Sequence, residues 1–301
     1  RERREFYPPA RTTTVKDPEG RSRTFPGYEG ALGLKNAYST DNFFAFVHDF
    51  DGDGWNDVLT YGLPHTPAYL YLNPRERGGH WPRHTVLNEV DNESPTFGDL
   101  LGNGQPVLIC SSLMRLGYAT PDPKDPTRPW TFHPISPPGQ WQRFTHGLGF
   151  GDINGDGRPD LLEKEAWWEQ PASLAGDPVW KKHPFPFAPG RGSSQMMVTD
   201  VNGDGLADVV SAKDAHGYGL SWFEQARGAD GAITFREHAI TSTKADEKLG
   251  GVQFSQLHAV TLADLDRDTV DAQHVGGGLQ PIGFLHAQFF QTPHTRGALR
   301  E

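Results

Sequence analysis

The sequence predicts an all-β fold, and its composition and a recurring motif both indicate this class. The 301 residues include 35 Gly, 25 Pro, 18 Phe, 8 Tyr and 8 Trp, a composition that suits short strands joined by tight turns. A nine-residue motif rich in Asp and Gly recurs five times, at intervals of 48 to 64 residues. A strand-like apolar run follows each of the first four copies, so we expect one small β-unit to be repeated along the chain.

The five copies of the motif mark the start of each repeat. They are "DFDGDGWND" from Asp49, "DLLGNGQPV" from Asp99, "DINGDGRPD" from Asp152, "DVNGDGLAD" from Asp200 and "DLDRDTVDA" from Asp264. A short strand-like run precedes each loop and another follows it, which accounts for two strands per repeat.

Two further markers predict a third and a fourth strand. The segments "YLNP", "YATP", "WEQP" and "FEQA" follow the first four motifs in order and indicate a third strand that ends in a turn. An aromatic-x-x-His pattern then indicates a fourth strand. Because its histidines recur with the repeat, we expect them to be structural; they are His84, His133, His183 and His238.

Four short strands in a tandem repeat of about 50 residues are typical of a β-propeller blade. We therefore expect residues 1–301 to form a single β-propeller domain, with four whole blades and two partial ones. The segment "REFYPP" at 4–9 resembles the last strand of a blade, which indicates that the blade is truncated at the N-terminus. Residues 269–301 have lost the register of the repeat, and we expect an atypical tail without blade strands there.

The Asp-rich loops predict calcium sites. Calcium takes hard oxygen ligands, which a tight turn can present from positions 1, 3, 5 and 9 together with the carbonyl of position 7. Three copies carry suitable residues at all of these positions, so we expect about three calcium ions. The ligands are Asp49, Asp51, Asp53, the carbonyl of Trp55 and Asp57; Asp152, Asn154, Asp156, the carbonyl of Arg158 and Asp160; and Asp200, Asn202, Asp204, the carbonyl of Leu206 and Asp208.

The other two copies are poorer candidates. The last offers only Asp264, Asp266 and Asp268 and is a weak metal site, whereas the loop from Asp99 has one carboxylate and is expected to be held by hydrogen bonds. An EF-hand would need Glu at position 12 and helices on both sides; only Glu163 fits, and its flanks do not read as helices. An acidic turn without an ion remains the alternative.

Composition also bears on partners. A net charge of −10 without a basic block disfavours nucleic acid, and no apolar run is long enough to cross a membrane. Cys110 lies in the apolar run "PVLICSS" and is expected to be a buried, inert thiol.

At "FGD" (97–99), "FGDINGDGRPD" (150–160) and "VTDVNGDGLADVV" (198–210), the chain resembles the FG-GAP/VCBS repeat family of calcium-loop propellers, which includes the head of integrin α subunits. The likeness covers about residues 40–268. Longer phrases are similar to secreted bacterial proteins of this class and to the propeller part of aldos-2-ulose dehydratase, a sugar lyase. The resemblance implies about seven blades, calcium in the loops and an extracellular or periplasmic location.

A candidate chemical site comes from aligning the repeats. Glu93, His146 and His258 each lie six residues before a motif Asp, near the start of the predicted innermost strand. They could form an acid-base site or hold a transition metal in the channel, or the histidines could simply bond to neighbouring blades. Other polar residues that could join the channel mouth are Asp214, His216, Gln195 and Gln256.

Two functions follow. The first is a calcium-binding module or scaffold whose top face contacts a carbohydrate or protein ligand. The alternative is a carbohydrate lyase or dehydratase that uses the channel residues. Trp167 and Trp168 could stack on a sugar, although paired aromatics in a blade strand are more often core.

Overall fold

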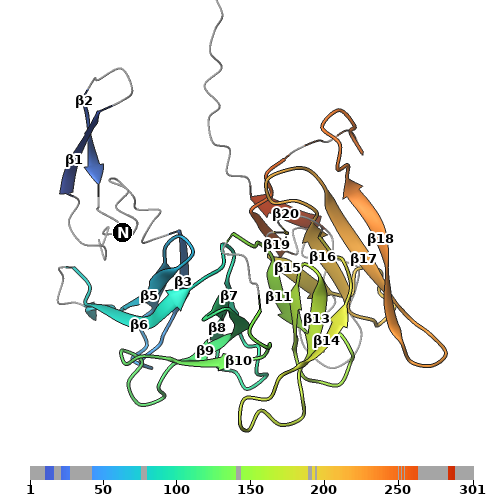
Figure 1. Cartoon of the computed structure of the whole chain (residues 1–301), viewed down its shortest axis with the longest axis horizontal. Helices are drawn as coiled ribbons and strands as arrows, with labels where there is room; N and C mark the ends of the chain where they lie inside the picture. The colour runs from blue at the N-terminus through green and yellow to red at the C-terminus, as the bar shows by residue number, and fades with distance from the viewer. Residues whose placement is uncertain are drawn as a thin grey trace, which may run out of the picture. The chain divides into compact units, whose positions relative to one another are not determined.

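The described part of the chain consists of β-strands. The computed structural model describes residues 11–16, 22–27, 43–75, 80–139, 144–188, 192–193, 195–249, 251, 253, 255–263 and 284–288. These ranges hold strands β1 to β20 and no α-helix, which confirms the all-β prediction (Figure 1). They accordingly include no helix that is long and apolar enough to span a membrane.

The chain divides into two compact units. The first comprises residues 1–145 and 173–179, and the second comprises residues 146–172 and 180–301. The fourth strand of each of the first three repeats lies in the same unit as its own first strand, so each repeat can be described within one unit.

The first unit contains two four-stranded antiparallel sheets, each with its strands in chain order. One sheet consists of β3 (Phe44–His48), β4 (Asp57–Tyr61), β5 (Thr66–Tyr71) and β6 (Arg83–Val90). The other consists of β7 (Thr96–Gly98), β8 (Val107–Ser112), β9 (Arg115–Thr120) and β10 (Thr131–Pro134). A hairpin of β1 (Arg11–Lys16) and β2 (Ser22–Gly27) precedes them.

The second unit contains two more meanders of four strands, joined into one eight-stranded sheet. The first has β11 (Leu148–Gly151), β12 (Asp160–Glu163), β13 (Ala166–Glu169) and β14 (Lys181–Pro184). The second has β15 (Met196–Thr199), β16 (Asp208–Ala212), β17 (Leu220–Arg227) and β18 (Ile233–Thr241).

The two meanders of the second unit meet at their first strands, β11 and β15, which pair in parallel. The approach is close: a Cβ on Gly149 would lie 2.1 Å from the carbonyl oxygen of Met196, so only glycine fits there. The first strands of these two repeats therefore lie side by side. The arrangement of the repeats as propeller blades stays a prediction.

Two of the four recurring histidines of the fourth strands, those of the second unit, make structural contacts, as predicted. His183 lies opposite Trp167 in the register of β13 and β14, and the two rings stack with centroids 3.8 Å apart. His238 stacks on Trp222 in the same way. The Nε2 atoms of these two histidines lie 2.7 Å from Glu169 and Glu224, respectively. In these two repeats, stacking and the contacts with glutamate thus hold the fourth strand against the third.

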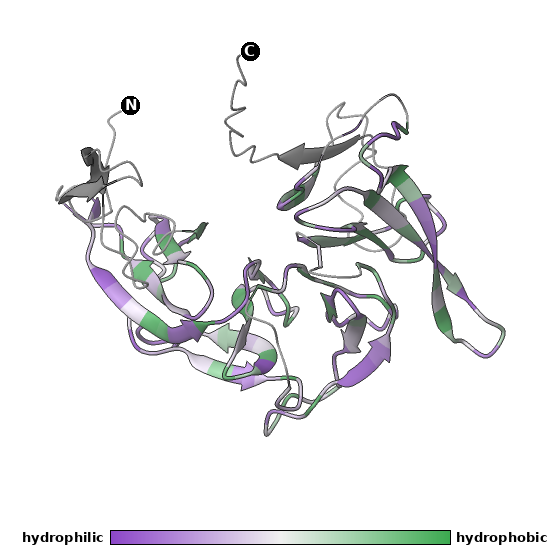
Figure 2. Ribbon diagram, turned by 45° about the horizontal axis from the view of Figure 1, so that its top comes forward, coloured by the Kyte–Doolittle hydropathy of each residue, from purple (hydrophilic) through white to green (hydrophobic). Residues whose placement is uncertain are grey.

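Buried apolar side chains of the strands pack into clusters. Figure 2 shows that the strands carry both apolar and polar stretches. Trp167 and Trp168 are 3% and 4% exposed, so they belong to the core and are not available to stack on a sugar. Cys110 is fully buried, and burial raises the pKa of its thiol. Both observations confirm the core interpretation of these residues.

One strand lies within the predicted atypical tail. β20 (Phe284–Gln288) pairs antiparallel with β19 (Ala259–Ala263) in a two-stranded sheet, and the lost register of residues 269–301 stays a prediction. The segment "FLHAQ" is free of Gly and Pro, so its backbone can extend despite the Gly-rich stretch before it. The predicted strand remnant at 4–9 lies outside the described residues.

Candidate metal centres

The predicted calcium loops share one backbone arrangement. The carboxylate of the first Asp accepts hydrogen bonds from the backbone N–H groups four and five residues later, as Asp49 does from Asp53 and Gly54 at 3.0 and 2.8 Å. Asp152 and Asp200 accept the corresponding bonds in their loops. Gly54 has φ 85°, a left-handed conformation that glycine adopts without strain. The loop therefore curls around the first carboxylate.

The ninth residue of each loop has a structural task that the sequence did not reveal. Asp160 is fully buried, and its two carboxylate oxygens accept the backbone N–H groups of Ile153 and Gln170 at 3.0 and 2.9 Å. In return, the side-chain amide of Gln170 donates to the carbonyl of Pro159 at 2.7 Å. This reciprocal clamp ties the loop to the end of the third strand.

The clamp recurs in the other two complete motifs. Asp57 pairs with Asn73, and Asp208 pairs with Gln225. The Asn or Gln in the markers "YLNP", "WEQP" and "FEQA" is thus the partner of the ninth residue of its own loop. The copy at Asp99 has Val107 at position 9, and its marker "YATP" has Thr120 in place of the amide. In these four copies, the marker therefore carries an Asn or Gln where the ninth loop residue is Asp.

Removing the charge of a clamp aspartate tests this role. In Asp160→Asn, one of the two oxygens becomes an amide nitrogen, which leaves one of the facing N–H groups without its acceptor. We expect the free energy of unfolding to fall by about 1–3 kcal/mol even without calcium. Denaturant unfolding in a chelator measures this, with Asp156→Asn as the control because Asp156 is not part of the clamp. Equal stability of the two variants would contradict the clamp.

The charge of these loops fits a bound cation. Burial raises the pKa of Asp57 and Asp208, and it raises the pKa of Asp160 to about 7; a nearby cation would favour the ionised forms. One carboxylate oxygen from each of Asp49, Asp51 and Asp53 lies within 4.8 Å of the others. Such a set of hard oxygens suits calcium.

Arginine side chains contact the fifth loop position in two motifs. The Arg75 guanidinium meets Asp53, and the Arg158 guanidinium meets Asp156. These contacts place positive charge beside a predicted calcium ligand, as expected for carboxylates that repel one another. The calcium sites stay a prediction. Asp264, Asp266 and Asp268 lie outside the described residues.

The loop from Asp99 behaves as the sequence predicts for a turn held by hydrogen bonds. Asp99 accepts the N–H groups of Asn103 and Gly104 at 3.0 and 2.8 Å. The side chain of Asn103 accepts the N–H of Gln105 at 2.9 Å. The same fold of the loop is therefore reached with one carboxylate.

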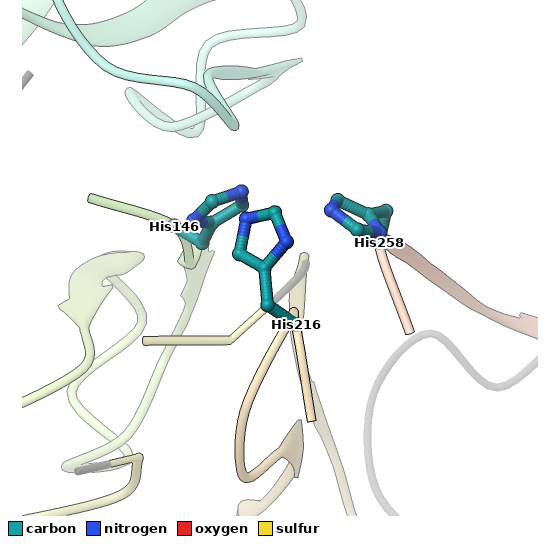
Figure 3. Close-up of side chains that lie close together, drawn as sticks. All are labelled: His146, His216 and His258. Atoms are coloured by element: carbon teal, nitrogen blue, oxygen red, sulfur yellow. The ribbon is translucent and has the colours of Figure 1, made fainter. Parts of the chain in front are cut away.

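Three histidines of the second unit come together from separate parts of the chain, as Figure 3 shows: His146, His216 and His258. One ring nitrogen from each lies within 4.8 Å of the others. The ring centroids are 4.7 to 5.4 Å apart, and the ring planes are inclined to one another by 70° to 83°. His146 is 1% exposed, whereas His216 is exposed. The cluster thus extends from the interior to the surface.

A chain of backbone hydrogen bonds connects the segments that carry these histidines. His146 forms an isolated parallel bridge with Gly192, and the carbonyl of Gly192 accepts the N–H of Ala215 at 2.9 Å, next to His216. The carbonyl of Gly217 accepts the N–H of Gln256 at 2.8 Å, two residues before His258. The backbone therefore sets the relative positions of the imidazoles.

The tautomer of His258 is suited to ligation. Its Nδ1 lies 3.1 Å from the carbonyl oxygen of Gln256, and because that oxygen can only accept, Nδ1 carries the proton. Nε2 then keeps its lone pair for a ligand. Metal-binding histidines commonly bond a backbone carbonyl in this way. Three imidazoles suit zinc, copper or nickel, and catalytic zinc sites keep a fourth position open.

The second unit contains two of the three residues of the sequence-predicted site. His146 and His258 come together, and His216, named only as a residue of the channel mouth, completes the cluster. Glu93 belongs to the first unit, where its N–H donates to the carbonyl of Thr145 at 3.2 Å. Asp214 supports the turn by accepting the N–H of His216 at 2.9 Å. Gln256 contributes through its backbone.

Gly192 offers a test of this arrangement. A Cβ there would lie 2.2 Å from the carbonyl oxygen of His146, and the residue has φ 97°. We expect Gly192→Ala to displace His146 and to weaken zinc binding by about tenfold or more, as loss of a supporting contact does in other metal sites. Zinc titration measures this. Gly176→Ala is the control, since Gly176 has φ 79° but open space around it; equal losses would contradict the proposed link.

Comparison with known proteins places the chain in no family. No protein-family model and no curated protein matches it. An Agrocybe aegerita lectin that recognises non-reducing terminal N-acetylglucosamine is 16% identical, with a TM-score of 0.40 over 67% of this chain and 52% of the lectin chain. The V. cholerae biofilm matrix protein Bap1 is 14% identical, with a TM-score of 0.34 over 75% of this chain and 41% of that one.

A third solved structure, the Photorhabdus luminescens Tc holotoxin pore, is 16% identical and has a TM-score of 0.32 over 85% of this chain and 12% of that one. The chain therefore spans about half or less of the length of each of these three proteins. Because the likenesses are weak, the proposals below rest on the residues of this chain alone.

Proposed function

We propose that the chain is a calcium-stabilised β-propeller module that binds a carbohydrate through a transition-metal ion held by His146, His216 and His258. The observation that carries this proposal is the approach of three imidazole nitrogens to within 4.8 Å of one another. Two nitrogens on one tetrahedral zinc ion are about 3.4 Å apart, given bond lengths near 2.1 Å. Side-chain adjustments of about an ångström would bring the set to that geometry.

The histidines of such a site would have different roles. His146 anchors it from the interior, and His216 reaches it from the surface, so a ligand can approach from the exposed side. When bound, the ion would supply a Lewis acid that attracts a ligand oxygen atom. Carbohydrate is the proposed class because its hydroxyl and carbonyl oxygens suit that position.

The three complete Asp-rich loops have a supporting role in this proposal. Each ion that binds only the folded loop would stabilise the scaffold by mass action. Loops of this kind that lie outside the cytoplasm work at millimolar calcium, and an extracellular or periplasmic location is part of the proposal.

The test is ligand binding with and without the transition metal. In calcium buffer, the zinc-loaded chain is expected to bind some of the glycans on an array. The same chain without zinc is expected not to bind them. The control is His183→Ala, whose imidazole stacks on Trp167 outside the cluster. Equal glycan binding with and without zinc would contradict a metal-centred site.

A second function, carbohydrate lyase, is favoured by one feature of the same cluster. Three protein ligands with an open fourth position are typical of catalytic zinc, whereas structural zinc has four. Release of an unsaturated product from anhydro- or keto-sugars by the zinc-loaded chain would support the lyase. Binding without turnover would leave the binding module as the function.

A further inference from the structure

A second group of metal-ligating side chains lies in the first unit, away from the Asp-rich loops. His65, Glu89 and Asp91 each place one ligand atom within 4.8 Å of the others. His65 lies in the turn between β4 and β5, Glu89 lies on β6, and Asp91 follows β6 directly. One imidazole and two carboxylates are thus gathered from two connected segments of one sheet.

Both carboxylates of this group approach the imidazole of His65. The Nδ1 atom of His65 lies 3.0 Å from Oε2 of Glu89 and 3.7 Å from Oδ1 of Asp91. The carboxylate side chains are 20% and 14% exposed, whereas the imidazole is 50% exposed. The acidic pair therefore forms the floor of the group, and the histidine covers it from the solvent side.

Backbone contacts hold all three residues in place. The N–H of His65 donates to the carbonyl of Val90 at 2.7 Å, and the N–H of Asp91 donates to the carbonyl of Ser111 at 2.8 Å. The N–H of Leu113 donates to the second oxygen of Glu89 at 2.9 Å. His65 has φ 73°, so its turn holds a non-glycine residue in a left-handed conformation. The group is built into the sheet and is not a chance meeting of long surface side chains.

The repeat provides an independent observation. His65 follows the first motif residue, Asp49, by 16 residues, and His216 follows Asp200 by the same number. Both histidines lie in the connection between the second and third strands of their repeats. Asp91 lies in the segment that leads into the next repeat, eight residues before Asp99, whereas His258 lies six residues before Asp264. The connection between the second and third strands thus supplies a ligating histidine in two repeats.

We propose that His65, Glu89 and Asp91 form a second transition-metal site, which takes a divalent ion of the zinc or manganese class. One imidazole with two carboxylates is a donor set that zinc and manganese accept. Two close carboxylates repel each other, and a divalent cation relieves that repulsion better than a single imidazolium does. The imidazole must give up its proton to ligate, so binding releases protons where His65 is charged.

The experiment is calorimetric titration of Zn²⁺ and Mn²⁺ into the full chain in calcium buffer. His216→Ala is used as the background, because it removes one ligand of the three-histidine cluster and leaves the second site intact. We expect one ion to bind in His216→Ala and none in His216→Ala with His65→Ala. Glu89→Gln, which keeps the shape of the side chain, should weaken binding in this background at least tenfold. His84→Ala in the same background is the control and should still bind one ion.

The proposal is overturned if the double variant, His216→Ala with His65→Ala, binds the ion as tightly as His216→Ala does. It is also overturned if folded His216→Ala binds no ion, in which case His65 and the carboxylates form only an ion pair. Because each comparison is made in the His216→Ala background, the result does not depend on the function of the three-histidine cluster. Failure of that cluster would instead appear as unchanged metal content between the wild-type chain and His216→Ala.

Discussion

Removal of calcium is expected to lower the melting temperature of the chain substantially. At a hundredfold excess over its dissociation constant, one ion that binds only the folded state contributes about 2.7 kcal/mol. For a domain of this size, that corresponds to a fall of roughly 5–10 °C per site. Differential scanning calorimetry with calcium and then with a calcium chelator measures the shift, and elemental analysis should find about three calcium ions per chain before chelation.

Variants of single loops separate ion binding from folding. Asp156→Asn should remove about one third of the calcium-dependent shift, because Asp156 stands at a ligand position and outside the clamp of its loop. Asp99→Asn should lower stability with and without calcium alike, since Asp99 accepts two backbone N–H groups in a loop with one carboxylate. An unchanged melting temperature on chelation would show that the loops are acidic turns without an ion.

Loss of the transition metal is expected when one histidine of the cluster is replaced. His216→Ala removes an exposed side chain, so we expect the fold to survive while zinc affinity falls by more than about 100-fold. This exceeds the 10- to 100-fold typical of a lost supporting contact, because His216 would itself be a ligand. Zinc titration should show one ion fewer than in the wild-type chain, and glycan binding should be lost with that ion.

His146→Ala should give the same loss of zinc binding with an added loss of stability, because His146 is buried. A matched control is His238→Ala, which removes an imidazole that stacks on Trp222 and contacts Glu224. That variant should be less stable but should keep its zinc. Full zinc binding in folded His216→Ala would exclude the cluster as a metal site.

The four-stranded repeat could be predicted from the sequence because its signals are local. Turn residues, apolar runs and the outer histidines recur at nearly constant spacing, so each copy supports the others. The markers correctly predict the third strands. Their purpose was not apparent, because the clamp between Asp160 and Gln170 joins residues whose contact depends on strand pairing.

The assembly of the candidate sites could be predicted only in part. Alignment of the repeats singles out Glu93, His146 and His258, since each lies six residues before a motif Asp. His216 approaches them through a loop whose path depends on the bonds to Gly192 and Gln256, which no sequence pattern announces. The group around His65 was missed for the same reason, although its spacing from Asp49 matches that of His216 from Asp200.

The parallel pairing of β11 with β15 also affects resistance to aggregation. Because these two strands cover each other, the eight-stranded sheet has its edges at β14 and β18. An open edge can recruit strands from other molecules, and charged side chains discourage this. β14 carries Lys181 and Lys182, and β18 carries Arg236 and Glu237. The apolar first strands are enclosed within the sheet, and charged strands form its edges.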